Sequence, residues 1–502
     1  MYDQFKEYGV VEAVYHPVVY VSGLPNVQPR ELVIFENNVQ GQVLRLHIDR
    51  VEVLLFSHHP VRVGLHVTRT GEQFTIALGD YLLGAVVDPL AIPLIARQEQ
   101  TTTLTTAVEV SEIERLIAEQ STERRPIDSS PPSILIRKNI RRQLITGVTL
   151  VDNLLPLGMG QRELVVGDRK TGKTTFALSA IRGHVKNGGK AIYAAVGKKL
   201  NELEQVREYL ATEKILDQVV VVGSTAQDAS SLVFMTPYTA VTIAEYLMDQ
   251  GNDILVVLDD LSTHAKYYRE ISLQAKQFPG RDSYPGDVFF THARLLERAG
   301  NFTHQAGERS LTILPIAETV ENDLTDYIVS NLIGITDGHL QFDTNEFIRG
   351  RRPAVNVSLS VTRVGKQTQN KLQQDVNRAL LAFMNSYQKS VAFSHFGTEL
   401  SAEIRQIIQT GNAIYDLFNQ SAKDSIVRQV QIVLLGLIWI DRGSRLADMI
   451  SIQRARNNLN TSYTQQQTTQ ELVAQILQAE TWEQLTTNVD KVSPQLYKLC
   501  LA

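Results

Sequence analysis

The most constraining feature of this chain is a phosphate-binding pattern, G-x-x-x-x-G-K-[ST], at residues 167–174. The apolar residues 163–166 before it predict a strand, and residues 175–182 after it have the spacing of a helix. A strand, a glycine-rich loop and a helix in this order form a cradle whose backbone N–H groups bind phosphate oxygens. The alternative is a glycine-rich turn that binds nothing. The residues that we expect to bind a nucleotide are Gly167, Asp168, Arg169, Lys170, Thr171, Gly172, Lys173, Thr174 and Thr175.

Other residues indicate that the nucleotide site also holds Mg²⁺. We expect Lys173 at the β and γ phosphates and the Thr174 hydroxyl as a Mg²⁺ ligand. Further along, the apolar run 254–258 is followed by Asp259 and Asp260. Such a run predicts a strand of a parallel sheet, whose carboxyl end opens onto the ligand crevice. Asp259 is therefore the expected Mg²⁺-organising carboxylate, and the alternative is a solvated Asp-Asp turn.

Composition and charge exclude several classes of protein. The 49 Lys+Arg and 54 Asp+Glu residues are interspersed without a basic tract, so nothing indicates nucleic-acid binding. Cys500 is the only cysteine, which excludes an internal disulfide and a zinc site built from cysteines. The first residues lack the features of a targeting peptide. The longest apolar run, 430–440, is shorter than the ~20 residues of a membrane span, so we expect that the chain does not cross a membrane by itself.

Hydrophobic periodicity divides the chain into three regions. Residues 1–90 contain short alternating apolar runs between turn signals, which predict a small antiparallel barrel or sandwich. Residues 91–370 alternate strands and helices, which predicts a P-loop α/β domain with a mostly parallel sheet, interrupted by an insert at about 95–135. Residues 371–502 keep helical spacing and predict a helical bundle. The barrel runs are 18–21, 31–35, 43–48, 51–56 and 61–67, and the insert holds a possible exposed helix at 108–117.

Three long stretches, residues 160–169, 279–298 and 352–365, resemble the alpha subunit of the rotary F-type ATP synthases. The resemblance extends from about residue 8 through the helical C-terminus. It implies an N-terminal β-barrel, a central RecA-like domain that binds ATP or ADP with Mg²⁺, and a C-terminal helical bundle. It also implies a ring in which three alpha subunits alternate with three catalytic beta subunits around a central shaft. Such a ring lies at the cytoplasmic face of the cell membrane, joined to a membrane sector and to a peripheral stalk.

Position 198 bears on whether this chain hydrolyses its own ATP. The catalytic beta subunits of this family place a Glu after the glycine that matches Gly197, and typical alpha subunits have a Gln. This sequence has Lys198, which donates hydrogen bonds and cannot accept a proton while it is charged. The nearest Glu is Glu202, and the loop residues Arg169 and Thr171 are also alpha-like. We therefore expect a chain that binds a nucleotide without turning it over.

Four further residues take expected roles from their positions in the family motifs. Arg363 matches the arginine that the family supplies to the γ-phosphate of the neighbouring beta subunit, a role that suits a permanently charged guanidinium. The alternative is an ordinary surface arginine. Phe347, Arg352 and Gln420 match the adenine pocket of the alpha subunit. The sequence around Gln420 departs from the family pattern, so the alternative for this residue is that it caps a turn.

Several positions differ from the family pattern. The N-terminal amphipathic helix is shortened to residues 1–8, so we expect a modified contact with the peripheral stalk. Arg142 and Gln143 replace the usual Glu-Pro, and the insert at 95–135 is unusual for the family. Together these differences indicate a divergent or alternate form of the synthase.

Two rival functions fit parts of the sequence. An autonomous hexameric ATPase motor, such as a secretion ATPase or an RNA helicase, would have a glutamate at position 198 and basic, aromatic loops lining its ring, and neither is visible. A purely structural subunit, like the non-catalytic chain of vacuolar-type enzymes, lacks the phosphate loop. The intact Lys173 and Thr174 argue against that second rival.

Overall fold

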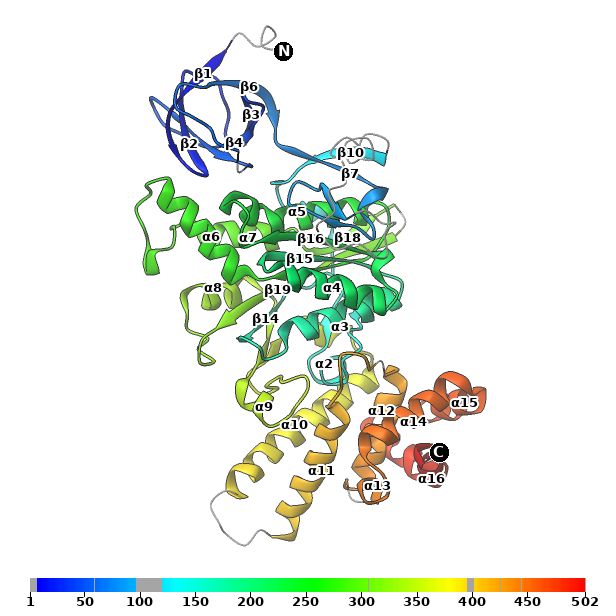
Figure 1. Ribbon diagram of the computed structural model, residues 1–502. Helices are drawn as coiled ribbons and strands as arrows, with labels where there is room; N and C mark the ends of the chain where they lie inside the picture. The colour runs from blue at the N-terminus through cyan, green and yellow to red at the C-terminus, as the bar shows by residue number, and fades with distance from the viewer. Residues whose placement is uncertain are drawn as a thin grey trace. The chain divides into compact units, whose positions relative to one another are not determined.

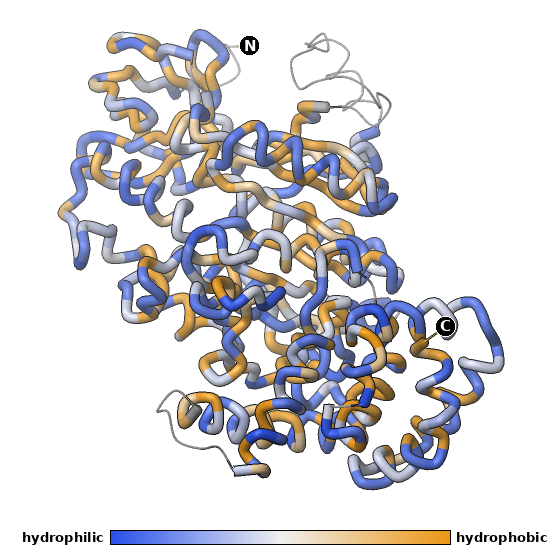
Figure 2. The backbone as a smooth tube through the Cα atoms, turned by 60° about the horizontal axis from the view of Figure 1, so that its bottom comes forward, coloured by the Kyte–Doolittle hydropathy of each residue, from blue (hydrophilic) through white to orange (hydrophobic). Residues whose placement is uncertain are grey.

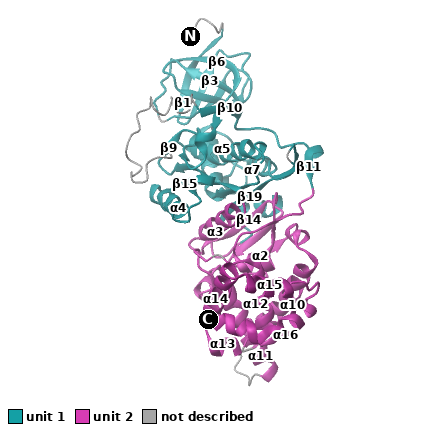
Figure 3. Ribbon diagram, turned by 90° about the vertical axis from the view of Figure 1, so that its right-hand side faces the viewer, with its two compact units in different colours: residues 1–138, 189–318, 324–335 teal, residues 139–188, 319–323, 336–502 magenta. Residues whose placement is uncertain are grey.

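The structure, a computed structural model, describes residues 7–57, 59–95, 120–305, 307–394, 401–424, 426–443 and 445–501. It falls into two compact units (Figure 3): unit 1 comprises residues 1–138, 189–318 and 324–335, and unit 2 comprises residues 139–188, 319–323 and 336–502. The expected helix at 108–117, and residues 1–6 of the expected stalk contact, lie outside the described residues. The domain boundaries expected near residues 90 and 370 do not coincide with the limits of these units and stay a prediction.

The N-terminal part of unit 1 is a closed barrel with the strand order β1-β2-β5-β4-β3-β6 (Figure 1). Alternate residues of each strand face the interior, where Val19, Phe35 and Val53 are fully buried. The predicted barrel is confirmed, but the strand expected at 61–67 is wrong in its bounds. Residues 61–65 form a loop with Gly64 at φ +89°, and the last strand begins at His66. The strands are β1 (Tyr8–Tyr15), β2 (Val18–Ser22), β3 (Glu31–Phe35), β4 (Gln40–Leu46), β5 (Val51–Leu55) and β6 (His66–Gln73).

The rest of unit 1 is built on a mostly parallel sheet, as predicted. Its parallel neighbours follow the order β19 (Gly307–Thr319), β17 (Ile254–Asp259), β15 (Lys190–Lys198), β16 (Val219–Thr225) and β8 (Val86–Val87). Every residue of β17 is buried, as expected for a strand covered on both faces. Antiparallel pairs add β9 (Pro93–Ile95) to β8, β18 (Gly300–His304) to β19 and β11 (Arg137–Lys138) to β18, and also join β7 (Thr75–Gly79) to β10 (Ser121–Pro126).

Helices cover this sheet (Figure 1), and α5 packs against β15, β16 and β17. The helix α4 packs against β15 and β16, and α6 packs against α5 and β15. The connections therefore alternate strand and helix, the arrangement that gives parallel pairing. The helices of unit 1 are α4 (Leu200–Thr212), α5 (Ser230–Asp249), α6 (Leu261–Gln274), α7 (Val288–Leu296) and α8 (Tyr327–Ile335).

In unit 2 the strands that carry the expected phosphate loop pair in the order β14-β20-β21. The strand β14 (Glu163–Asp168) is parallel to β20 (Gly338–Phe342), which is antiparallel to β21 (Val361–Thr362). The helix α3 (Lys173–Lys186) follows β14, and α9 (Thr344–Ile348) follows β20. A short pair, β12 (Gln143–Leu144) and β13 (Leu157–Gly158), flanks α2 (Thr149–Leu154).

The C-terminal part of unit 2 is helical, which confirms the predicted bundle. The apolar run at 430–440 lies in α12, which is buried from Val430 to Ile438 and packs against α16 and α14. Hydrophilic and hydrophobic residues alternate along these helices (Figure 2), as amphipathic helices require. In the part of the chain that the structure describes, no helix has both the length and the apolar composition of a membrane span. The helices are α10 (Lys371–Ser394), α11 (Ala402–Phe418), α12 (Arg428–Ile440), α13 (Arg445–Met449), α14 (Ile452–Gln465), α15 (Gln467–Ile476) and α16 (Trp482–Leu501).

A buried ion pair ties the elements of unit 1 together. Arg298, at the end of the 279–298 stretch, has a side chain that is 1% exposed. Its guanidinium makes a bidentate contact with Glu245 on α5, with Nε–Oε1 at 2.7 Å and Nη2–Oε2 at 2.6 Å. It also donates to the Ile127 carbonyl and to the Thr242 hydroxyl, each at 2.9 Å. The arginine therefore joins α5 to the segment after α7 and to the chain at residue 127.

We expect Arg298→Met to lower the free energy of unfolding by about 3–5 kcal/mol, because it leaves the Glu245 carboxylate, which is only 14% exposed, without its partner. Urea denaturation followed by circular dichroism measures the change. The control is Arg281→Met, whose side chain is 71% exposed and 3.6 Å from Asp282, and which should cost about 0–1 kcal/mol. Equal losses in the two variants would contradict this account of Arg298.

Candidate functional site

The expected phosphate loop follows the predicted order of strand, loop and helix. The strand β14 ends at Asp168, and the helix α3 begins at Lys173. Two glycines permit this path. Gly167 has φ +154°, and a Cβ there would lie 2.2 Å from the Phe342 carbonyl oxygen. Gly172 has φ +100° and precedes the first turn of α3. Glycine is the residue that adopts such conformations without strain, so the loop depends on both positions.

The loop presents the donors that an anion requires. The Lys173 side chain lies in the loop and donates to the carbonyl oxygens of Gly167 and Asp168 at 2.8 and 2.6 Å. The Thr171 hydroxyl donates to the Asp168 carbonyl at 2.8 Å. The N-terminus of α3 has no side-chain cap hydrogen bond, and its first turn contains Thr174 and Thr175. The N-terminus of a 14-residue helix, next to a lysine, suits a phosphate group because of the helix dipole and the orientation of its first N–H groups.

Asp168 has contacts that the local sequence did not indicate. One carboxylate oxygen accepts from the Thr319 hydroxyl at 2.6 Å and from the Asn322 N–H at 2.9 Å. The other accepts from the Thr344 hydroxyl at 3.0 Å. Burial alone raises the pKa of Asp168, but these hydrogen bonds outweigh it, so the pKa is lowered. The carboxylate therefore holds the phosphate loop to two distant segments of unit 2.

Asp259, the expected Mg²⁺-organising residue, lies in unit 1 and already has charged and polar partners. Its Oδ1 is 2.7 Å from the Lys198 Nζ, and its Oδ2 accepts from the Tyr193 hydroxyl at 2.6 Å. The Asp259 side chain is 2% exposed. Among the described residues, no group of three or more His, Cys, Asp and Glu is arranged to hold a metal. The Mg²⁺ roles expected for Asp259 and Thr174 stay predictions, and Thr174 lies in the first turn of α3, as expected.

The three residues expected at an adenine base lie in unit 2. The Arg352 guanidinium lies over the Phe347 ring, 3.6 Å from its centroid, and donates to the Phe347 carbonyl at 2.9 Å. The Gln420 Oε1 accepts from the N–H and the hydroxyl of Thr149, each at 3.0 Å. Its Nε2 donates to the Gly147 carbonyl at 2.5 Å and to the Asp424 carbonyl at 3.2 Å. These four bonds use the whole capacity of the Gln420 amide, which favours the alternative that it caps the start of α2.

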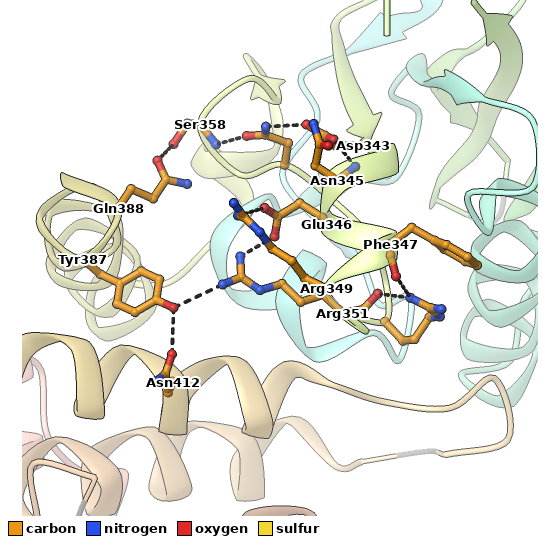
Figure 4. A network of polar contacts seen from close by, with 12 residues as sticks. Asp343, Asn345, Glu346, Phe347, Arg349, Arg351, Ser358, Tyr387, Gln388 and Asn412 are labelled. Carbon is orange, nitrogen blue, oxygen red and sulfur yellow. Dashed lines mark hydrogen bonds and ion pairs between the residues drawn. The ribbon is translucent and has the colours of Figure 1, made fainter. Parts of the chain in front are cut away.

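A polar network braces the segment that contains Phe347 and Arg352 (Figure 4). The Glu346 carboxylate on α9 contacts Arg351 and also Arg349, the latter at 2.9 Å. Arg351 reaches the Tyr387 hydroxyl on α10 at 3.2 Å, and that hydroxyl donates to Asn412 on α11 at 2.8 Å. The Arg351 guanidinium also lies 3.4 Å from the centroid of the Tyr415 ring. The segment after β20 is thus fixed to two helices of the C-terminal bundle.

Arg363 is exposed and follows the short strand β21. The strand pairs with β20, with Thr362 opposite Gly338, and the Arg363 N–H donates to the Asp337 carbonyl at 3.2 Å. The Thr362 hydroxyl donates to the Pro156 carbonyl at 2.9 Å. After the arginine, Gly365 lies so close to Pro156 that a Cβ would be 1.6 Å from the Pro156 oxygen. The backbone around Arg363 is therefore held on both sides while its side chain faces outward.

Comparison with known proteins gives consistent matches. A family model described as the ATP synthase alpha/beta family, nucleotide-binding domain, matches residues 147–362. The chain is 37% identical over 443 residues to the ATP synthase subunit alpha of Mycoplasmoides gallisepticum (strain R(low / passage 15 / clone 2)), covering 86% of this chain and 82% of that protein. It is 36% identical over 429 residues to the ATP synthase subunit alpha 1 of Mycoplasmopsis pulmonis (strain UAB CTIP), covering 85% and 78%. A third similar protein is the ATP synthase subunit alpha of Mesomycoplasma hyopneumoniae (strain 7448), 37% identical over 436 residues, covering 87% and 82%.

We expect Asp168→Asn to destabilise unit 2 by about 1–3 kcal/mol at pH 7, because the hydrogen bonds lose their charged acceptor. A carboxylate whose pKa is lowered in the folded state stabilises the fold fully at pH values above its pKa in the unfolded chain, which is about 3.9 for Asp. This stabilisation is lost as the pH falls through the pKa of the folded state. The difference in Tm between wild type and variant should therefore persist from pH 7 to pH 5 and shrink below about pH 4.

Thermal unfolding at several pH values checks this expectation. The control is Asp490→Asn, because Asp490 is an exposed residue of α16. A Tm difference for Asp168→Asn that is constant down to pH 3, or no larger than that of the control, would contradict it.

Proposed function

The chain belongs to the family of ATP synthase alpha subunits, and from that membership we propose that it is the non-catalytic, ATP-binding alpha subunit of a rotary F-type ATP synthase. In this function it binds ATP or ADP at the loop 167–175 and supplies Arg363 to an adjacent catalytic beta subunit. The complex couples ion movement across a membrane to the synthesis or hydrolysis of ATP. One observation carries the proposal: an intact phosphate loop is present in a chain that has Lys198 where a catalytic subunit needs a glutamate.

Nucleotide binding is supported by the geometry of the loop. Gly167 and Gly172 have the conformations that turn the backbone around an anion, and Lys173 lies in the loop. The hydroxyl of Thr174 is the group that we propose for Mg²⁺, which would screen the charge of the phosphates. Phe347 and Arg352 offer an aromatic face and a fixed guanidinium for the base. For Gln420 we propose the alternative, a cap at the start of α2, because its amide is bonded to Thr149 there.

The absence of turnover is supported by the chemistry of Lys198. A general base must accept a proton from the attacking water. Burial alone lowers the pKa of Lys198, but the Asp259 and Asp260 carboxylates outweigh it and raise that pKa above its usual range. The lysine therefore stays protonated at neutral pH and cannot act as the base.

The action of Arg363 on a neighbouring subunit is supported by how it is presented. No residue that the structure describes forms a hydrogen bond or an ion pair with the Arg363 guanidinium. The backbone at Arg363 is held by β20 and by the contacts at Pro156. A preorganised positive charge stabilises the charge that develops on a transferring phosphoryl group without reorganisation. The planar fork of arginine also matches two phosphoryl oxygens.

In the proposed assembly three copies of this chain alternate with three beta subunits around a central shaft. The ring is peripheral, at the cytoplasmic face of the cell membrane, and reaches the membrane sector through the rest of the complex. The peripheral stalk would contact the N-terminal end of the chain in a modified way.

We expect the isolated chain to bind ATP and to hydrolyse it at least about 10²-fold more slowly than the ring reconstituted with a beta subunit, since it lacks a general base. Equilibrium dialysis with labelled ATP measures binding, and a phosphate-release assay measures turnover. Lys173→Ala should abolish the binding while the circular dichroism spectrum is unchanged. Robust hydrolysis by the chain alone, or ATP binding that survives Lys173→Ala, would refute the proposal.

We expect rings built from Arg363→Ala chains and unaltered beta subunits to assemble and bind ATP normally but to hydrolyse it about 10³–10⁵-fold more slowly. Arg363→Lys should restore little, because an ammonium keeps the charge and loses the bidentate fork. The control is Arg378→Ala on α10, whose side chain is 77% exposed. Near wild-type turnover in the Arg363→Ala ring would show that Arg363 is an ordinary surface residue.

A further inference from the structure

The end of β15 places a lysine on two neighbouring carboxylates of unit 1. The Lys198 Nζ is 2.7 Å from the Asp259 Oδ1 and 3.4 Å from the Asp260 Oδ2. The lysine side chain is 20% exposed, whereas the aspartate side chains are 2% and 3% exposed. This is a largely buried ion pair at the strand end where a metal-organising carboxylate was expected.

Other donors of the protein also contact the two carboxylates. The Tyr193 hydroxyl donates to the Asp259 Oδ2 at 2.6 Å. Asp260 caps α6, accepting from the Thr263 N–H at 2.7 Å and from the Thr263 hydroxyl at 3.1 Å. Each carboxylate is thus held by donors of the protein.

The backbone of β15 directs Lys198 to this position. The strand is in parallel register with β17 up to Ala195, which lies opposite Asp259, and its register with β16 shifts between Ala195 and Lys198. Gly197 within this irregularity has φ +60°, and a Cβ there would lie 3.0 Å from the Tyr267 ring. The glycine therefore permits the turn after which the lysine reaches the end of β17.

We propose that Lys198 is the resident cation of the Asp259–Asp260 carboxylate pair and that it closes this strand end to Mg²⁺. The ammonium supplies fixed positive charge to a pair that would otherwise be buried without compensation. A divalent ion would need oxygen ligands at about 2.0–2.1 Å and would compete with the ammonium and the Tyr193 hydroxyl for the Asp259 oxygens. The carboxylate pair is thereby closed to Mg²⁺ while Lys198 is in place.

Electron paramagnetic resonance of Mn²⁺ bound to the nucleotide-free chain tests the proposal. We expect Lys198→Gln to bind one additional Mn²⁺ at the Asp259–Asp260 pair, with an affinity at least about tenfold higher than that of the same position in wild type. Lys199→Gln, at the adjacent exposed lysine, should behave as wild type. The double variant Lys198→Gln/Asp259→Asn should lose the additional ion. Unchanged Mn²⁺ binding in Lys198→Gln would overturn the proposal.

Asp259→Asn alone provides a test that does not depend on the folding of Lys198→Gln. In a chain that retains the lysine this nearly isosteric change should leave Mn²⁺ binding unaltered. Loss of a Mn²⁺ site in Asp259→Asn would show that the carboxylate binds the ion despite Lys198, and would overturn the proposal.

Discussion

Parallel pairing between neighbouring strands determines which side chains can meet in each unit. The carboxyl ends of parallel strands lie at the same edge of a sheet, so the residues that leave these ends become neighbours. In unit 1 the register of β15 with β17 places Ala195 opposite Asp259, and Lys198 then reaches that carboxylate. In unit 2 the register of β14 with β20 places Gly167 opposite Phe342, so the phosphate loop and α9 start side by side. The contact between Asp168 and Thr344 follows from that register.

The sequence predicted elements whose signals are local. The apolar run 163–166 became β14, the run before Asp259 became β17, and the helical spacing after residue 371 became α10 to α16. The strand expected at 61–67 was misplaced because its apolar residues alternate through a loop that contains Gly64. The contacts of Asp168 and of Lys198 could not be predicted, since both depend on strand register and on residues far along the chain. The lysine at position 198, where typical alpha subunits have a neutral glutamine, was the one available signal for the second contact.

Arg298 and Lys198, two largely buried cations of unit 1, both pair with carboxylates but differ in their roles. Arg298 is surrounded by acceptors from three segments, and its contacts fix the packing of α5. Lys198 lies at the end of a strand, where side chains face a ligand crevice in parallel sheets, and its partners are the carboxylates expected to organise a metal. A guanidinium with five fixed donors suits the first environment, whereas a compact ammonium on a flexible stem suits the second. Burial alone therefore does not separate a structural cation from one that changes the chemistry of a site.

Under the proposed function, the pairing order β14-β20-β21 gives a physical reason for the chain to keep a nucleotide without hydrolysing it. The phosphate loop leaves β14, Phe347 and Arg352 follow β20, and Arg363 follows β21. A ligand that binds only the folded state stabilises it in proportion to the logarithm of its concentration over Kd. A nucleotide that touches the loop and the segment after β20 would thus stabilise the strands on which Arg363 is carried. Under the proposed function, binding without turnover makes that stabilisation persistent, because a bound ATP that is not consumed does not leave the site at each catalytic cycle of the neighbouring subunit.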